Sequence, residues 1–312
     1  SRRVPGIVAG VAGAVALACV PALAQSDFPT RPMTTFVGTT PGGGSDTMGR
    51  MVSQKLSEIL GKPVVVENRP GASNTIAVES TVKAKPDGHT LFVGTNTPMS
   101  IAPHLISLKY DTLKDIQPVA LVTLVPNILV INKDMGIDSV AQLIDYMKKN
   151  PNKIKYGSSG LGTTHVVLAE QLNMTAGVQS VHVPYAGSPQ AHIDIIAGVI
   201  NIMIDTSAGL LPQIRSGNLK ALAVTSVQRL AEIPNVPTIR EAGYPQLEMQ
   251  TMYGLYTTAK TPRPIVEKLN TAMNKGLGEA DFQKKLLDFG GQLVKPMSVA
   301  EFEAFHKAEY ER

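Results

Sequence analysis

"LVTLVPNILVIN", residues 121–132, is a long, mainly aliphatic stretch. It has the character of extended strand throughout, with no helix-like segment within it. Its β-branched side chains favour an extended strand. A second such run, "EMQTMYGLYTTA" (248–259), follows a long loop-like stretch. Elsewhere strand-like and helix-like segments alternate, which is typical of mostly parallel sheets covered by helices. Two such isolated strands can connect two domains, one carrying the chain out of the first domain and the other bringing it back.

We therefore predict an α/β protein with a discontinuous first domain, residues 27–124 and 248–312, and a second domain formed by residues 125–247. The 312 residues less a leader of 24 leave about 288, which exceeds the usual size of a single core and favours two domains. Continuous tandem domains are the alternative, and periodicity alone leaves that alternative open.

Residues 1–24 are predicted to be a secretory signal peptide. Arg2 and Arg3 precede an apolar run that ends near Val20, and "ALAQ" offers a small-residue cleavage point. The run is shorter than the roughly 20 apolar residues that a membrane anchor needs. An acylation site at Cys19 is a further alternative, although Ala16 stands where a larger aliphatic residue is usual. Without its leader the chain has no cysteine, and export without disulfides suits a bacterial periplasm.

Charge and motif spacing argue against several classes of partner. Removing Arg2 and Arg3 leaves 27 basic residues against 25 acidic ones, so no concentrated basic face is expected and we predict no nucleic-acid partner. The six histidines have no metal-ligand spacing, so no metal is predicted. The glycine-rich segments lack the lysine of a phosphate-binding P-loop and the order of a dinucleotide fingerprint, so no cofactor is predicted. Ser159 has Leu161 where a nucleophile elbow needs glycine, although three-dimensional clustering of Ser, His and Asp stays open.

Two glycine-rich loops remain, "FVGTTPGGGSD" (36–46) and "GSSGLGTTH" (157–165), and each leads from a strand into a helix. Ser45 is a plausible cap for a helix from about Asp46 to Leu60. Unpaired N–H groups and a helix dipole at such a junction attract anions. Because no lysine or arginine is nearby in the sequence, a carboxylate fits better than a phosphate. The alternative is that the glycines only make tight turns. The hydroxyl-bearing residues of the two loops are Thr39, Thr40, Ser45, Ser158, Ser159, Thr163 and Thr164.

The chain resembles the substrate-binding proteins of tripartite tricarboxylate transporters, also called the Bug family. The likeness covers nearly the whole chain after the leader, and it depends on the order and spacing of several motifs together. These are "PGGGSDTMGR", "KPVVVENRPGAS", "KPDGHTLFVGT", "VPNILVIN", "KIKYGSSGLGTTH", "VHVPYAGSPQAHIDIIAG", "LKALAVTS" and "VPTIREAGYP".

The resemblance implies a two-lobed periplasmic "Venus flytrap", with two mixed or parallel sheets flanked by helices and two crossover strands. It also implies a monomeric periplasmic receptor that closes on a small organic carboxylate, performs no chemistry and delivers the ligand to membrane permease subunits. Asp205 falls where the family places another cleft residue; it could orient a ligand hydroxyl or a bridging water, or cap the following helix. The ligand-binding residues expected from the resemblance and the loops are Thr39, Thr40, Gly43, Gly44, Ser45, Ser159, Gly162, Thr163, Thr164 and Asp205.

Two departures from the family pattern bear on the ligand. Gly38, Thr39 and Thr40 replace the usual proline and aromatic residue, which frees volume and predicts a bulkier di- or tricarboxylate, including an aromatic one such as terephthalate. His165 lies one place before the expected histidine, whose position here is Val166. The competing functions are a co-receptor that presents its ligand to a membrane sensor kinase and a periplasmic hydrolase.

Overall fold

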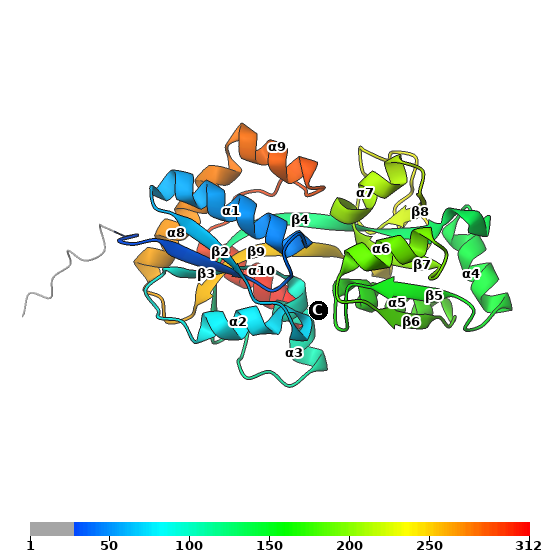
Figure 1. Cartoon of the computed structure of the whole chain (residues 1–312), viewed down its shortest axis with the longest axis horizontal. Helices are drawn as coiled ribbons and strands as arrows, with labels where there is room; N and C mark the ends of the chain where they lie inside the picture. The colour runs from blue at the N-terminus through cyan, green and yellow to red at the C-terminus, as the bar shows by residue number, and fades with distance from the viewer. Residues whose placement is uncertain (1–27) are drawn as a thin grey trace, which may run out of the picture.

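The computed structural model describes residues 28–312, so the predicted signal peptide lies outside the described residues. The described chain is an α/β structure of two lobes, each with its own sheet and covering helices (Figure 1). One long strand, β4 (Ile116–Asn132), runs through both sheets. None of the helices within residues 28–312 is long and apolar enough to cross a membrane.

The first sheet has the strand order β2-β1-β3-β9-β4. Strand β1 pairs in parallel with β2 and β3, whereas β9 runs antiparallel to both β3 and β4. The bounds of the strands other than β4 are β1 (Met33–Val37), β2 (Val64–Asn68), β3 (Thr90–Thr95) and β9 (Gln250–Thr258).

Helices cover both faces of the first sheet because its strands are apolar on both sides. One face packs against α1, α8 and α9, whose buried residues include Met48, Val266 and Phe282. The other face packs against α2 and α10, which contribute Val78 and Phe302. The bounds of these helices are α1 (Gly44–Leu60), α2 (Thr75–Val82), α8 (Arg263–Leu277), α9 (Ala280–Asp288) and α10 (Val299–Glu311).

The second sheet continues from the far half of β4. There β4 pairs antiparallel with β7 and β8, and the parallel strands β5 and β6 complete the sheet. Successive residues of β4 face opposite sides: Leu129 packs with α4 and α5, whereas Ile128 and Val130 pack with α6 and α7. The bounds are α4 (Val140–Lys149), β5 (Lys155–Ser158), α5 (Thr164–Ala176), β6 (Val181–Pro184), α6 (Ser188–Ile196), β7 (Ile202–Thr206), α7 (Ser207–Arg215) and β8 (Leu219–Val224).

The junction between the lobes lies where β4 passes from one sheet to the other. Strand β9 begins there, with Gln250 opposite Pro126, and runs back into the first sheet. Asn127 ties the junction together: its Nδ2 donates to Met249 O at 3.1 Å, and Thr251 Oγ1 donates to its Oδ1 at 3.1 Å. Because β4 leaves and β9 returns, the two strands run antiparallel. Each sheet is mostly parallel with one reversed strand, β9 in the first sheet and β4 in the second.

Helix α1 begins earlier than the sequence predicts. It starts at Gly44, its N-cap is Gly43, and Ser45 lies inside the first turn, so the prediction of Ser45 as the cap is wrong. Thr39 supplies the missing acceptor instead, because its Oγ1 accepts from the N–H of Asp46 at 3.1 Å. The remaining short elements are η2 (Ala72–Asn74), η3 (Thr97–Ile101), α3 (Ala102–Leu105), η4 (Lys133–Met135) and η5 (Pro245–Leu247).

Candidate functional site

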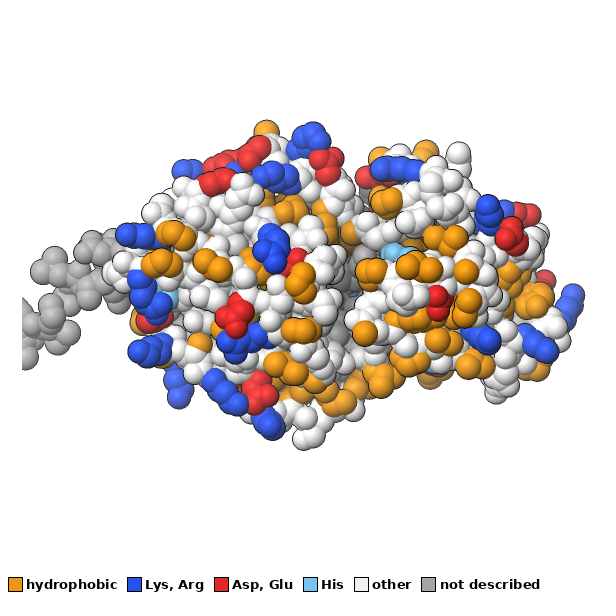
Figure 2. Space-filling model, in the orientation of Figure 1, with side chains coloured by type: hydrophobic (Ala, Val, Ile, Leu, Met, Phe, Trp, Pro, Cys, Tyr) orange, Lys and Arg blue, Asp and Glu red, His pale blue; other side chains and the backbone are white. Residues whose placement is uncertain are grey.

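A cleft separates the two lobes (Figure 2). It encloses a cavity of about 1370 Å³, and residues of both lobes line it, including both glycine-rich loops. Ligand pockets usually measure roughly 300–1,000 Å³. The cavity is therefore large enough for a small organic ligand together with water.

The first loop connects β1 to α1 and is fixed by its own side chains. The carboxylate of Asp46 accepts from the N–H of Gly42 at 2.9 Å, and Asn68 Nδ2 donates to Thr39 O at 2.9 Å. A Cβ on Gly44 would lie 2.7 Å from the hydroxyl oxygen of Tyr253, so only glycine permits this close approach. The loop thus holds the backbone at the start of α1 against the wall of the cleft.

The second loop connects β5 to α5. Thr163 is the N-cap of α5, but its side chain makes no cap hydrogen bond, because Oγ1 donates instead to Gly160 O at 2.9 Å. Gly160 and Gly162 have φ values of +132° and +69°, which glycine adopts readily. These glycines therefore do make a tight turn. The turn also leaves the first N–H groups of α5 uncapped.

Neither helix start is capped by its N-cap side chain. Within residues 28–312 no protein atom accepts a hydrogen bond from the N–H groups of Gly44 and Ser45 in α1, or of Thr164 and His165 in α5. All four residues line the same cavity. Two positive helix ends with free donors therefore face one space, which is an arrangement suited to an anion.

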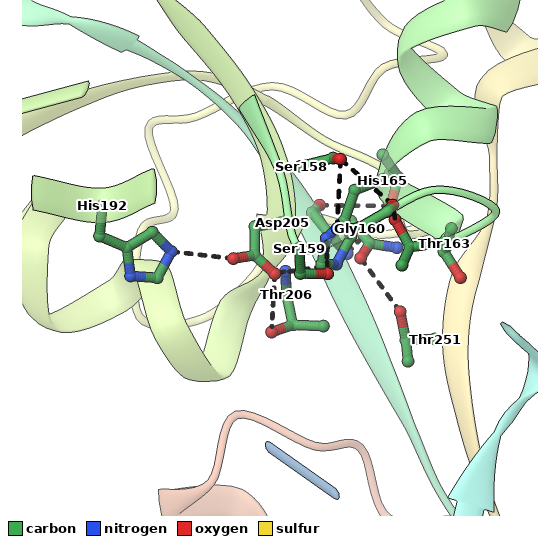
Figure 3. Close-up of polar contacts among 12 residues, drawn as sticks. Ser158, Ser159, Gly160, Thr163, His165, His192, Asp205, Thr206 and Thr251 are labelled. Atoms are coloured by element: carbon green, nitrogen blue, oxygen red, sulfur yellow. Dashed lines mark hydrogen bonds and ion pairs between the residues drawn. The ribbon is translucent and has the colours of Figure 1, made fainter. Parts of the chain in front are cut away.

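Asp205 lies at the end of β7 beneath this space and is bonded to two histidines (Figure 3). His165 Nε2 is 2.9 Å from Oδ1, and His192 Nε2 is 2.8 Å from Oδ2. The Asp205 side chain is 2% exposed, and Oδ1 also accepts from the N–H of Thr206 at 2.6 Å. Thr206, not Asp205, is the N-cap of α7, so Asp205 does not cap that helix.

The two histidines explain, by charge interaction and by hydrogen bonds, why Asp205 is ionised despite its burial. Burial by itself raises the pKa of a carboxyl, but His165 and His192 together hold the pKa of Asp205 well below its usual range. Tyr253, across the cleft on β9, shows the opposite effect. Burial raises the pKa of its phenol, the charge of Asp205 adds to that rise, and a hydrogen bond with Ser45 opposes it. Tyr253 therefore stays neutral.

His165 also contacts Ser159, because its Nδ1 lies 2.9 Å from Ser159 Oγ. Ser159, His165 and Asp205 are the residue types of a nucleophilic triad, but the ring nitrogens are exchanged. In serine hydrolases the serine contacts Nε2 and the aspartate contacts Nδ1. The three-dimensional clustering of Ser, His and Asp that the sequence leaves open is thus present in the cleft.

The structure brings most of the predicted site residues to one cavity. Thr39, Thr40, Gly43, Gly44, Ser45, Ser159, Thr163, Thr164 and Asp205 line it, whereas Gly162 is not among the lining residues. Several lining residues were not predicted, because they come from elements that meet the two loops only in the folded protein. They are Tyr185, His192, Tyr253, Lys285 and Phe289.

The expectation that no cationic side chain lies near the loops is wrong, because Lys285 lines the cleft. The sequence places no lysine or arginine near either loop, but α9 brings Lys285 to the edge of the cleft. Tyr253 and Phe289 form an edge-to-face pair in the same wall, with ring centroids 5.7 Å apart. The cleft therefore has aromatic rings even though the first loop has none.

Comparison with known proteins identifies the family. The family model described as "Tripartite tricarboxylate transporter family receptor" matches residues 48–311. The chain is 35% identical to the protein BugT of Bordetella pertussis over 266 residues, which cover 84% of this chain and 82% of BugT. The resemblance inferred from the motifs is therefore confirmed.

Solved structures agree with this result. The chain is similar to a Rhodopseudomonas palustris protein, Rpa4515, whose structure holds adipate (TM-score 0.86, 33% identity, covering 91% of this chain and 95% of that one). It is also similar to MatC of Rhodopseudomonas palustris with bound malate (TM-score 0.85, 30% identity, covering 91% and 98%). The family and these neighbours are binding proteins.

Proposed function

The chain belongs to the tripartite tricarboxylate transporter receptor family, and on that premise we propose that it binds a small organic carboxylate between its lobes. We propose further that it is a monomeric periplasmic receptor, exported by the signal peptide at residues 1–24, and that it delivers its ligand to the membrane permease subunits of a transporter.

The observation that carries the proposal is that the uncapped starts of α1 and α5 face one cavity. The free N–H groups of Gly44, Ser45, Thr164 and His165 can donate to a carboxylate. A hydrogen bond to a charged group contributes roughly 1.5–3 kcal/mol before ordering costs. Four such bonds support an affinity on the order of micromolar, about −8 kcal/mol. The hydroxyls of Thr39, Thr40, Ser159 and Thr163 complete the proposed site with Gly43 and Asp205, whereas Gly162 would act only by shaping the second loop.

A dicarboxylate fits the rest of the cleft. Lys285 offers a countercharge for a second carboxylate at the cleft edge, and Tyr253, Phe289 and Tyr185 flank the space with aromatic rings. The relatives whose structures hold malate and adipate support this ligand class. We include aromatic dicarboxylates such as terephthalate, because the first loop carries no ring and the cavity is large.

Binding is coupled to lobe closure in this proposal. The first lobe, residues 27–124 and 248–312, captures the carboxylate, and the second lobe, residues 125–247, then brings α5 onto it. Ser73 Oγ already donates across the cleft to Leu161 O at 2.6 Å, and Thr164 Oγ1 lies 3.3 Å from Asn96 Oδ1. Ligand would favour the closed form because that form makes both sets of contacts. The permease would recognise the closed shape.

A hydrolase is the second candidate, and the Ser159–His165–Asp205 arrangement is the observation that favours it. The exchanged ring nitrogens argue against it. Incubation with p-nitrophenyl acetate and with a monoester of adipic acid distinguishes the two roles. A receptor returns the esters unhydrolysed, whereas turnover that Ser159→Ala abolishes would establish the hydrolase.

The direct test is a thermal-shift screen of mono-, di-, tri- and aromatic carboxylates, followed by calorimetry on the compounds that raise the melting temperature. We expect a dicarboxylate to bind with a Kd on the order of micromolar. If no carboxylate in the panel bound, or if amines bound instead, the proposed function would be wrong. Pull-down of either permease subunits or a sensor kinase with the liganded protein separates transport from signalling.

A further inference from the structure

Four polar side chains form a continuous chain of hydrogen bonds at the floor of the cleft (Figure 3). Ser159 Oγ lies 2.9 Å from His165 Nδ1, His165 Nε2 lies 2.9 Å from Asp205 Oδ1, and His192 Nε2 lies 2.8 Å from Asp205 Oδ2. The two imidazoles are 9% and 12% exposed, and the carboxylate is 2% exposed. All four residues line the cleft, and the chain of hydrogen bonds runs along its floor.

The ionised carboxylate decides where the protons lie. Asp205 can only accept, so Nε2 of His165 and Nε2 of His192 must both carry hydrogen. When His165 is neutral, its Nδ1 then has no hydrogen and can only accept. The hydroxyl of Ser159 must donate to that nitrogen. Ser159 Oγ consequently presents only lone pairs to the cleft, and lone pairs repel a carboxylate.

We propose that Ser159, His165 and Asp205 determine specificity as a proton relay, so that a ligand carboxylate beside Ser159 binds together with one proton. This inference rests on the proposed carboxylate-binding function. The proton comes from solvent and attaches to Nδ1 of His165. The resulting N–H donates to Ser159 Oγ, and the hydroxyl of Ser159 turns to donate to the ligand. A ligand hydroxyl or ammonium at this place donates to Ser159 directly and needs no proton.

Charge balance points in the same direction. With both histidines neutral, the Asp205 group carries one negative charge, and a proton on His165 neutralises it. An anionic ligand therefore favours the protonated state, because two uncompensated negative charges would share a poorly hydrated space.

The other charged groups around the cleft are already paired or lie at its edge. Asp46 on α1 pairs with Arg50 at 2.9 Å, and Asp194 on α6 accepts from the hydroxyl of Tyr185 at 2.7 Å. Lys285 and Asp288 of α9 line the cleft wall opposite, and Tyr253 on β9 is neutral. The relay is thus the titratable group at the floor that can respond to ligand charge.

Calorimetry measures the proton directly. Adipate, malate and terephthalate are titrated into the protein at about pH 8, where imidazoles are mostly neutral, in phosphate and in Tris buffer. The difference in binding enthalpy between buffers of different ionisation enthalpy gives the number of protons taken up. We expect about one proton per bound carboxylate ligand, with an affinity that falls about tenfold per pH unit above this point.

Two variants assign the proton. His165→Gln should bind without uptake, whereas the matched control His192→Gln, which replaces the other imidazole beside Asp205 by an amide that does not titrate, should retain it. The relay would be overturned by any one of three results. These are no proton uptake by the unchanged protein, proton uptake that persists in His165→Gln, and proton uptake that is lost in His192→Gln. Tight binding with no uptake contradicts the relay but leaves the proposed function intact; failure of every carboxylate to bind contradicts both.

Ser159→Ala tests the same inference in a variant that removes one oxygen and is expected to fold. At about pH 6 the serine donates to the ligand, so its loss should weaken binding about tenfold. At about pH 8.5 the ligand still binds together with its proton, so the serine donates to it in the complex and the same change should again weaken binding about tenfold. A loss of less than about twofold at both values would show that Ser159 does not donate to the ligand and would overturn the proposal.

Discussion

Gly44→Ala separates binding from folding at the start of α1. The new Cβ would lie 2.7 Å from the hydroxyl oxygen of Tyr253, so the phenol must move. Displacing an aromatic side chain from its preferred rotamer costs about 0.5–1.5 kcal/mol. Replacing a helical glycine by alanine returns roughly 0.5–1 kcal/mol. The two effects nearly cancel, and the free energy of unfolding should change by less than about 1 kcal/mol.

The effect of Gly44→Ala on binding should be much larger. The methyl group stands beside the N–H groups of Gly44 and Ser45 that we assign to the ligand, and it shifts Tyr253 within the cleft wall. Loss of one hydrogen bond to a charged acceptor, roughly 1.5–3 kcal/mol, corresponds to about a 10- to 150-fold weaker Kd. Isothermal calorimetry with the tightest dicarboxylate of the screen measures this change, and thermal unfolding of the free protein measures stability.

Gly61→Ala is the matched control. Gly61 follows the far end of the same helix with φ of +67°, and nothing lies near its missing Cβ. Alanine in this left-handed conformation costs about 1–2 kcal/mol, so this variant should lose a few degrees of melting temperature and keep its affinity. If Gly44→Ala bound as tightly as the unchanged protein, the N-terminus of α1 would not hold the ligand.

Three further predictions follow from individual contacts. Thr163→Ala removes the hydrogen bond from Thr163 Oγ1 to Gly160 O and should weaken ligand binding by about tenfold. The control Thr175→Ala, at the other end of α5, should leave the Kd unchanged. If calorimetry gave the same Kd for both variants, Thr163 would have no role in binding. Lys285→Met should weaken a dicarboxylate more than a monocarboxylate, with the exposed Lys284→Met as control, and equal losses would exclude a second carboxylate at Lys285. Burial lowers the pKa of His306 to about 4, so its neutral form contributes stability above the ordinary value near 6.5. That contribution, about 3 kcal/mol, is lost as the pH falls from about 6.5 to 4; denaturant unfolding of His306→Leu should lack this slope, and an unchanged slope would contradict the assignment.

The general architecture could be predicted because it depends on local patterns. The apolar run at 121–132 predicted a strand, and β4 ends at Asn132 as expected. The loops were predicted from glycines at strand–helix junctions, since only those residues tolerate the required backbone. The helix start was misplaced by two residues, because the residue that serves as acceptor, Thr39, is seven positions before Asp46. Sequence rules for caps look only at immediate neighbours.

Ser159 and Asp205 at the floor of the cleft were expected, but their contacts and most of the cleft walls could not be predicted, because these depend on tertiary contacts. Asp205 and His192 lie on adjacent elements and meet only after β7 and α6 pack. Tyr253 and Lys285 reach the cleft from the returning segment of the chain, far from either loop. The sequence therefore indicated no cation near the site. His165, whose position departs from the family pattern, turned out to connect Ser159 with Asp205.

The central claim is that backbone N–H groups at the starts of α1 and α5 donate hydrogen bonds to the same ligand carboxylate. A crystal structure of the protein with its tightest-binding dicarboxylate tests this most directly. The account predicts carboxylate oxygens at about 2.7–3.2 Å from backbone nitrogens of both helix starts, those of Gly44 or Ser45 and of Thr164 or His165. A carboxylate bound to Lys285 alone, with no contact to either helix start, would contradict it.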